Sequence, residues 1–155
     1  YGYEGLGELF VFLFFGIVAV TGSYYVQIQE LSWEAFALAV PVGLIASAIL
    51  VVNNVRDLET DRRAGKRTLA VRLGRRRTRV LYAAMLVLAY LSLGVVCLGL
   101  SEWVFLPFAT VPLAVRLARV VRTRTDGPSL NGALAGTGAL QLAFCVLLAA
   151  GVLLS

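Results

Sequence analysis

Five long apolar stretches divide the chain, and short polar connections separate them. The stretches are Leu9 to Val26, Ala35 to Val52, Val80 to Leu100, Trp103 to Val121 and Ala133 to Leu154. Each is close to the ~20 helical residues that cross a ~30 Å hydrocarbon core. The pattern predicts an all-α membrane protein with five transmembrane helices, at residues 9–26, 35–61, 80–100, 103–121 and 133–154.

The fourth stretch is the least regular of these. Pro107 and Pro112 lie inside it and are expected to kink the helix, because proline removes a backbone hydrogen bond and its ring clashes with the preceding turn. Arg116 and Arg119 interrupt its end, but arginine side chains are long enough to extend towards lipid headgroups. The stretch is therefore still expected to span the membrane.

Composition supports a membrane protein and excludes an ordinary soluble domain. Hydrophobic residues make up 59% of the 155 residues, charged residues only 15%, and the mean hydropathy is +0.84. A soluble protein is nearer ~45–50% apolar, with about a quarter of its residues charged. The sequence has no histidine, so catalysis would rest on carboxylates, cations, hydroxyls or a bound metal. Cys97 and Cys145 form no metal or redox motif and are expected to be packing residues.

The basic residues lie on alternate connections, which predicts an orientation in the membrane. Ten of the fourteen lie at or within the second connection: Arg56, Arg62, Arg63, Lys66, Arg67, Arg72, Arg75, Arg76, Arg77 and Arg79. The other four lie at the fourth: Arg116, Arg119, Arg122 and Arg124. Because successive helices alternate in direction, both connections share one side, and the positive-inside rule makes that side cytoplasmic.

This distribution predicts that loops 53–79 and 116–132 and the beginning of the chain are cytoplasmic, and that its end is outside. The net charge of +5 is then accounted for by orientation and by anionic headgroups. Membrane lipid, and no nucleic acid, is the expected partner of these residues.

Two features near the last stretch indicate helix packing. Gly132 and Gly136 lie one turn apart, and small residues allow a neighbouring helix to approach closely. Gln141 is costly to expose to lipid and is expected to form an interhelical hydrogen bond, with a ligand contact as the alternative.

A polar stripe follows the second apolar stretch without any turn residue, so the helix is expected to continue beyond the membrane core. Asn53, Asp57 and Asp61 repeat every four residues and share one helix face, from which Glu59 points away. Gly65 is expected to end the helix and let the chain turn back over the stripe.

The two aspartates of the stripe have a spacing compatible with a magnesium site. Carboxylates one turn apart can each give one oxygen to Mg²⁺, which keeps other positions for water and phosphate oxygens. A bound diphosphate would attract the nearby cations Arg56, Lys66, Arg67 and Arg72. The alternative is a solvated loop in which Glu59 pairs with Arg63 and the aspartates pair with scattered arginines. Spacing by itself leaves both interpretations open.

The segment from Asn53 to Gly74 resembles the second aspartate-rich motif of the UbiA superfamily of intramembrane prenyltransferases. Its paired asparagines, its Arg-Asp, the aspartate four residues later, and its Gly-Lys-x-Thr-Leu and Val-Arg-Leu-Gly segments are similar to the 1,4-dihydroxy-2-naphthoate polyprenyltransferase (MenA) branch. The residues from Gly5 to Leu9 and from Tyr24 to Gln27 also resemble this branch, so the resemblance covers most of the chain.

The resemblance implies a nine-helix bundle in the bacterial cell (inner) membrane. Residues 1–155 would be the C-terminal part of a UbiA-type domain and supply the last five of these helices. The first aspartate-rich motif of the family has no counterpart in this sequence. These residues alone are therefore expected to be inactive.

The implied reaction is Mg²⁺-dependent transfer of a polyprenyl group from a polyprenyl diphosphate to 1,4-dihydroxy-2-naphthoate with decarboxylation, which gives demethylmenaquinone. Asp57 and Asp61 would be the catalytic residues that hold Mg²⁺. The residues expected to bind or support the diphosphate are Asn53, Arg56, Lys66 and Arg72. Another aromatic acceptor, 4-hydroxybenzoate or homogentisate, is one alternative, and a non-catalytic membrane assembly partner is another.

Overall fold

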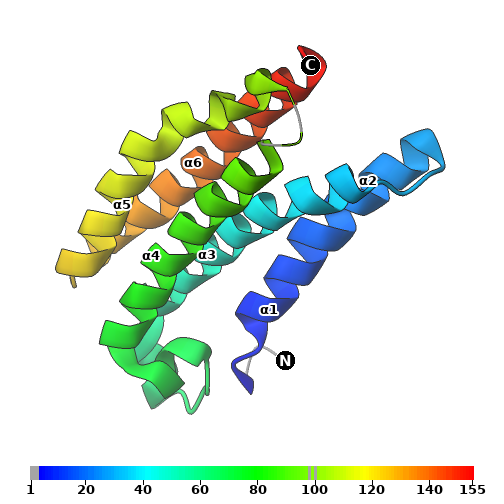
Figure 1. The fold of residues 1–155 in the computed structure, drawn as a ribbon. Helices are drawn as coiled ribbons and strands as arrows, with labels where there is room; N and C mark the ends of the chain where they lie inside the picture. Colours follow the sequence, from blue (N-terminus) through cyan, green and yellow to red (C-terminus); the bar gives the residue numbers. More distant parts are fainter. Residues whose placement is uncertain (1–3, 98, 100) are drawn as a thin grey trace.

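The computed structural model describes residues 4–97, 99 and 101–155, and this part of the chain contains helices and no strand. The elements are α1 (Gly7–Val11), η2 (Phe12–Val18), α2 (Ala19–Ile28), α3 (Trp33–Arg63), α4 (Leu69–Cys97), η3 (Glu102–Thr110), α5 (Val111–Thr123) and α6 (Gly127–Leu153). The π-helical η2 joins α1 to α2, and the 3₁₀-helical η3 leads into α5, which leaves five rods (Figure 1). All five are long and apolar enough to cross a membrane, so the predicted all-α membrane fold is confirmed.

Two helices begin earlier than the apolar pattern predicts. α4 begins at Leu69 rather than at residue 80, so much of the expected 53–79 loop is helical. Its first turn is anchored by Ala70, which is fully buried, and only Gly74 interrupts it, with φ 77° and ψ 160°. α6 begins at Gly127 rather than at residue 133, because the Asp126 side chain accepts a hydrogen bond from the Ser129 amide at 2.9 Å.

The prolines of the fourth rod have the predicted effect on its regularity. Pro107 lies inside the 3₁₀ segment η3, and Pro112 occupies the first turn of α5, where its missing N–H costs nothing. The rod therefore changes from 3₁₀ to α geometry at Val111.

The central rod is α3, which packs against α4, α6 and η2. Its residues Ile45, Val51 and Val52 are completely buried, and Tyr82 of α4 and Phe144 of α6 join the same core. Because lipid is as apolar as these side chains, the gain comes mainly from close van der Waals packing rather than from leaving water.

One close helix crossing lies at a glycine pair that the sequence pattern did not indicate. A Cβ on Gly16 of η2 would lie 2.5 Å from the Gly43 Cα of α3, so either side chain would force the rods apart. Of the two glycines predicted to pack, Gly136 is confirmed, because a Cβ there would lie 2.6 Å from Leu117 Cδ2. The prediction is wrong for Gly132, which has nothing within 4 Å of a Cβ position.

Polar side chains join helices inside the bundle. Gln141 Nε2 donates a hydrogen bond to the Val42 carbonyl oxygen at 3.3 Å and so links α6 to α3, which confirms the interhelical role. The hydroxyls of Tyr82 and Thr137 lie 2.8 Å apart and link α4 to α6.

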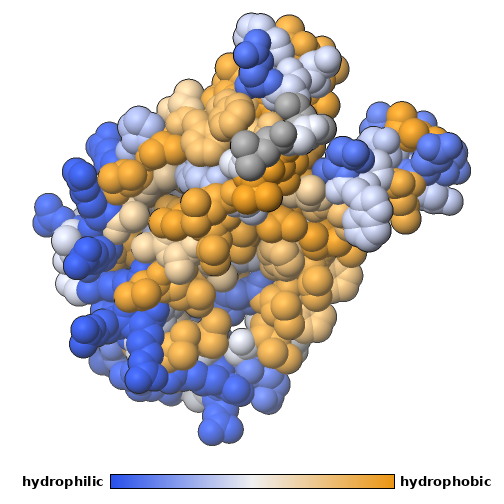
Figure 2. All heavy atoms as spheres, in the orientation of Figure 1, coloured by the Kyte–Doolittle hydropathy of each residue, from blue (hydrophilic) through white to orange (hydrophobic). Residues whose placement is uncertain are grey.

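The outer faces of the rods are apolar, whereas one end of the bundle is hydrophilic. Large exposed apolar side chains include Phe15, Leu91 and Leu142. Figure 2 shows hydrophilic atoms gathered at the lower end and left edge, where the α3–α4 and α5–α6 connections lie in Figure 1, with smaller patches at the opposite ends. This pattern is that of a multi-pass membrane protein with one strongly charged end.

Candidate functional site

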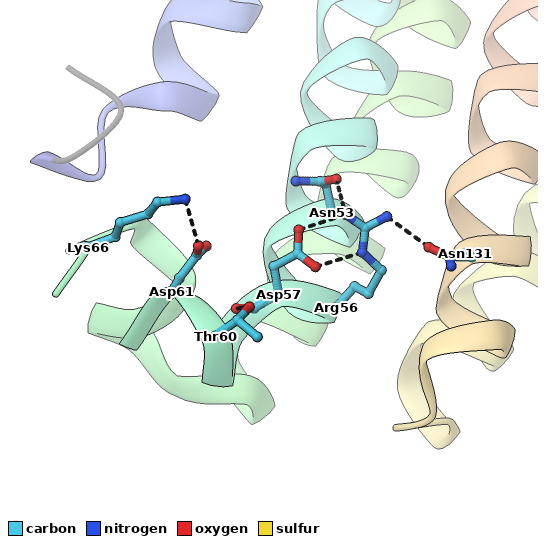
Figure 3. A network of polar contacts seen from close by, with 7 residues as sticks. All are labelled: Asn53, Arg56, Asp57, Thr60, Asp61, Lys66 and Asn131. Atoms are coloured by element: carbon cyan, nitrogen blue, oxygen red, sulfur yellow. Dashed lines mark hydrogen bonds and ion pairs between the residues drawn. The ribbon is translucent and has the colours of Figure 1, made fainter. Parts of the chain in front are cut away.

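The predicted stripe lies on the last turns of α3, which continues unbroken to Arg63. Asn53, Asp57 and Asp61 lie along one side of this helix (Figure 3). The helix can extend this far because no glycine or proline occurs between Gly43 and Gly65, whose φ of 70° turns the chain away. The predicted helical continuation and the glycine turn are both confirmed.

Asp57 is held by a two-pronged ion pair with its neighbour in the sequence. Arg56 Nε donates to Asp57 Oδ1 at 2.7 Å, and Arg56 Nη2 donates to Asp57 Oδ2 at 2.6 Å. This is the parallel geometry in which a guanidinium binds a carboxylate most strongly. The two side chains keep 25% and 32% of their surface exposed, so the pair remains accessible.

Arg56 also connects the stripe to the last helix. Its Nη2 donates to Asn53 Oδ1 and its Nη1 donates to Asn131 Oδ1 of α6, both at 2.8 Å (Figure 3). Asn131 is a site residue that the sequence pattern did not indicate, because it lies 75 residues further along the chain. The only feature of the sequence that could have indicated Asn131 was its polar amide side chain at the beginning of an apolar helix.

Asp61 forms an ion pair with Lys66, and the turn at Gly65 places Lys66 beside it. Lys66 Nζ lies 3.0 Å from Asp61 Oδ1, and the Lys66 amide donates to the Asp61 carbonyl oxygen at 3.0 Å. The Asp61 side chain is only 10% exposed, whereas that of Lys66 is 41% exposed. The segment after Gly65 therefore turns back over the stripe, as predicted.

Arg72 contacts a different part of the molecule. Its Nη2 lies 3.3 Å from Glu4 Oε2, and its Nε donates to the Arg67 carbonyl oxygen at 3.2 Å. These contacts tie the segment before α1 to the start of α4. The role of Arg72 in binding a diphosphate stays a prediction.

A buried carboxylate anchors α1 beside the stripe. Glu8 is 4% exposed, and its Oε1 accepts a hydrogen bond from Asn54 Nδ2 of α3 at 2.9 Å. Ser47 Oγ donates to the Glu8 carbonyl oxygen at 3.0 Å, while Glu8 Oε2 is buried without a partner among the described residues. Glu8 therefore has a tertiary role rather than only complementing a helix N-terminus.

Glu59 lies on the other side of α3, as predicted, but its partners differ from the expected one. It pairs with Arg62 at 3.2 Å and with Arg75 at 3.6 Å rather than with Arg63. Arg75 Nη1 also donates to the Val55 carbonyl oxygen at 2.9 Å. These contacts join α3 to the beginning of α4, although exposed ion pairs contribute only ~0–1 kcal/mol each.

The donor set of the stripe suits a metal that shares its ligands with a substrate. Within residues 4–97, 99 and 101–155, no three His, Cys, Asp or Glu side chains are grouped closely enough to form a metal cage. Two carboxylates one turn apart still match Mg²⁺, which commonly takes one or two protein carboxylates and leaves other positions to water and phosphate. The residues therefore fit a substrate-bridged Mg²⁺ rather than a tightly bound structural ion.

An apolar groove ends at this stripe. It has a volume of about 530 Å³ and is lined by Val11 and Phe15 from the first rod, by Ala46 and Leu50 among other residues of α3, and by Leu134 of α6. Its polar lining residue is Asn53. The groove could therefore hold the apolar part of a ligand while the stripe binds its anionic head.

This combination of fold and stripe is that of a known class of membrane protein. The chain belongs to the UbiA prenyltransferase family, whose model matches residues 1–130. The matched part contains the whole stripe and extends into the first turn of α6.

Individual relatives sharpen this assignment. The 1,4-dihydroxy-2-naphthoate octaprenyltransferase of Mycobacterium leprae (strain TN) is 43% identical over 155 residues, which is 100% of the chain and 52% of that protein. The protein of the same name from Mycobacterium tuberculosis (strain ATCC 25618 / H37Rv) is 44% identical over 149 residues, 96% of the chain and 51% of that protein. The UbiA prenyltransferase domain-containing protein 1 of Homo sapiens is 36% identical over 122 residues, 79% of the chain and 36% of that protein. The chain thus spans about half the length of the mycobacterial relatives.

Proposed function

We propose that the protein containing this chain is a Mg²⁺-dependent prenyltransferase that transfers a polyprenyl group from a polyprenyl diphosphate to 1,4-dihydroxy-2-naphthoate. Transfer with decarboxylation releases carbon dioxide and diphosphate and gives demethylmenaquinol, the reduced form of demethylmenaquinone. The proposal is supported by family membership and by the names of the mycobacterial relatives. In this proposal, residues 1–155 are the C-terminal part of the catalytic domain.

The observation that carries the proposal is the meeting of the groove and the stripe at Asn53. The groove is apolar along three rods and suits an isoprenoid tail. The stripe offers carboxylates and cations at the place where the diphosphate of the same molecule would lie. One amphiphilic substrate therefore accounts for both features.

In the proposed mechanism, the protein holds the leaving diphosphate while the allylic carbon–oxygen bond breaks. Asp57 and Asp61 would hold Mg²⁺, which supplies positive charge to stabilise the charge that develops on the diphosphate. Arg56 and Lys66 are paired with these same carboxylates in the structure, so each cation is already positioned beside the site. The cations would move to phosphate oxygens as their carboxylates become ligands, and the electron-rich acceptor ring then attacks the allylic carbon.

Asn53 and Asn131 would keep Arg56 in place during this exchange. Both amide oxygens accept hydrogen bonds from its guanidinium, so the side chain remains anchored when Asp57 is engaged elsewhere. Arg72 would bind the distal phosphate only if its contact with Glu4 were exchanged.

We also propose that the end carrying the stripe faces the cytoplasm. The stripe, the α3–α4 connection and the α5–α6 connection lie at the same end of the bundle (Figures 1 and 2). The fourteen cations lie in residues 56–79 and 116–124, in these connections or in the helix segments next to them. The positive-inside rule then gives a cytoplasmic stripe in a bacterial inner membrane.

The test is an activity assay of the full-length protein in membranes, with three acceptors: 1,4-dihydroxy-2-naphthoate, 4-hydroxybenzoate and homogentisate. We expect transfer to the naphthoate alone, dependent on Mg²⁺, and its loss in Asp57→Ala and Asp61→Ala. Glu59→Ala is the matched control, because this carboxylate lies on the opposite side of α3. Normal turnover in both aspartate variants would overturn the metal assignment, and transfer to another acceptor would overturn the substrate.

A further inference from the structure

A second apolar groove runs along the outside of the bundle, between α4 and the η3–α5 rod. Its volume is about 660 Å³. Several of its lining side chains are strongly exposed, among them Val87 at 57%, Leu91 at 60% and Val95 at 69%. It shares no lining residue with the groove that ends at Asn53.

The groove is long and straight because both of its walls follow helical spacing. On α4 the lining residues recur every three or four positions from Ala83 to Val95, which at the helical rise spans about 18 Å. This length is comparable to one leaflet, half of the ~30 Å hydrocarbon core. The hydroxyl of Tyr90 in this wall is bonded to Thr110 Oγ1 at 2.7 Å, so it does not interrupt the apolar surface.

Each wall continues into an arginine at the same end of the groove. Arg79 lies one turn before Ala83 on α4, and Arg122 lies one turn after Ala118 on α5. The helices run in opposite directions, so these arginines belong to one end (Figure 1), and Figure 2 shows hydrophilic atoms gathered at this edge.

Arg79 is fixed at this end without any carboxylate. Its Nη2 donates a hydrogen bond to the carbonyl oxygen of Arg124, the residue that ends α5. Its Nε is buried with no hydrogen-bond partner in the described part of the chain. Neither Arg79 nor Arg122 forms an ion pair with a described acidic residue, so their charge is not neutralised by the protein.

We propose that this groove binds one acyl chain of an anionic phospholipid and that Arg79 and Arg122 bind its headgroup phosphate. The apolar walls match a single hydrocarbon chain in length and chemistry. The unneutralised arginines are placed at the depth of the headgroups, where each basic residue favours anionic lipid. The lipid comes from the leaflet on the basic side of the bundle.

The test is native mass spectrometry of the full-length protein released from detergent, with phosphatidylglycerol or phosphatidylcholine of identical chains added. We expect the phosphatidylglycerol adduct to exceed the phosphatidylcholine adduct about tenfold. Arg122→Gln and Arg79→Gln should each reduce this preference. Because Arg79 also caps α5, Arg122→Gln is the decisive headgroup variant.

The chain component is tested by filling the groove. A Cβ on Gly94 would make an ordinary 3.7 Å contact with Phe108 Cζ, so Gly94→Leu should be accommodated while its larger side chain occupies the groove. This variant should lose both lipid adducts. Arg77→Gln is the matched control, because Arg77 is exposed on the opposite side of α4 and its removal changes net charge equally.

Five results would overturn the proposal. Equal binding of the two lipids, or an unchanged preference in Arg122→Gln, would exclude headgroup recognition by these arginines. Retention of the adducts in Gly94→Leu would place the lipid elsewhere. Displacement of phosphatidylglycerol by polyprenyl diphosphate, or appearance of a dimer in which the groove is covered by a second copy, would assign the groove to a different occupant.

Discussion

The stripe on α3 and the basic end of α4 and α5 use arginine in different ways. On α3, Arg56 donates two hydrogen bonds to the Asp57 carboxylate and one to each of two asparagine side chains. On α4, Arg79 is held by a backbone carbonyl oxygen alone, with no carboxylate partner in the described residues. The first arrangement neutralises a cation and keeps it ready for exchange, whereas the second leaves positive charge available to anions from outside.

The largest difference between the two regions is expected in catalysis. Arg56→Gln removes both the partner of Asp57 and a proposed diphosphate donor, so we expect kcat/KM of the full-length protein to fall about 10²–10³-fold. Arg122→Gln removes an equal charge from the other region and should leave kcat/KM within about twofold. Steady-state prenyl-transfer assays measure kcat/KM of both variants. Equal losses would show that the two regions do not use arginine differently.

A conservative change separates charge from geometry at the stripe. Arg56→Lys keeps the positive charge but cannot bind Asp57, Asn53 and Asn131 at once, since an ammonium lacks the planar fork. We expect about a tenfold loss in kcat/KM. Arg62→Lys, at an exposed position on the same helix, provides the control. A fully active Arg56→Lys enzyme would show that only charge matters there.

Two glycines set the positions of the cations in the two regions. Gly65 has φ 70° and lies directly before Lys66. Gly74 has φ 77° and lies before Arg75, Arg76, Arg77 and Arg79 of α4. Alanine at either position would carry ~1–2 kcal/mol of backbone strain, because a side chain disfavours positive φ. Gly65→Ala should therefore raise KM for the polyprenyl diphosphate several-fold. Gly74→Ala should weaken the preference for anionic lipid. Gly132→Ala is the control, because it is helical with open space around a Cβ. Identical phenotypes for Gly65→Ala and Gly74→Ala would mean that the regions are coupled.

The smallest effect is expected at Asp126, a carboxylate of the basic end that serves a backbone amide instead of an arginine. The hydrogen bonds from Ser129 hold the pKa of Asp126 below its usual value. Because the pKa is lowered on folding, the stabilisation is present at neutral pH and is lost as the pH falls through the folded-state pKa. Asp126→Ala should lower Tm slightly at pH 7, by an amount that shrinks as the solution is acidified, as measured by thermal unfolding in detergent. A Tm difference that persists in acid would exclude the charged cap.

Local sequence patterns were sufficient to predict the five membrane-spanning rods and the helix face that forms the stripe. Apolar length gave five spans, and the four-residue spacing of Asn53, Asp57 and Asp61 gave a shared helix face. The start of α4 was missed because Leu69 to Arg79 contains six basic or polar residues and lacks the long apolar run used to recognise a membrane helix. Its helical structure depends partly on Ala70 being buried in the bundle.

The partners across helices were beyond the reach of sequence patterns. Asn131 reaches Arg56 over 75 residues, and Glu8 reaches Asn54 over 46. Many polar residues at helix ends have the same local pattern, and only the rotation and depth of each helix decide which of them meet. The contact between Gly16 and Gly43 likewise depends on where two rods cross.

The sequence by itself determined the number of spans, the charged end, the acidic stripe and the turn at Gly65, because each follows from residues close together along the chain. The tertiary structure decided that both aspartates are already paired with cations, that an apolar groove ends at Asn53, and that Arg79 and Arg122 stand at one end of a second groove. These features arise between helices, where packing selects one set of contacts from many that periodicity allows.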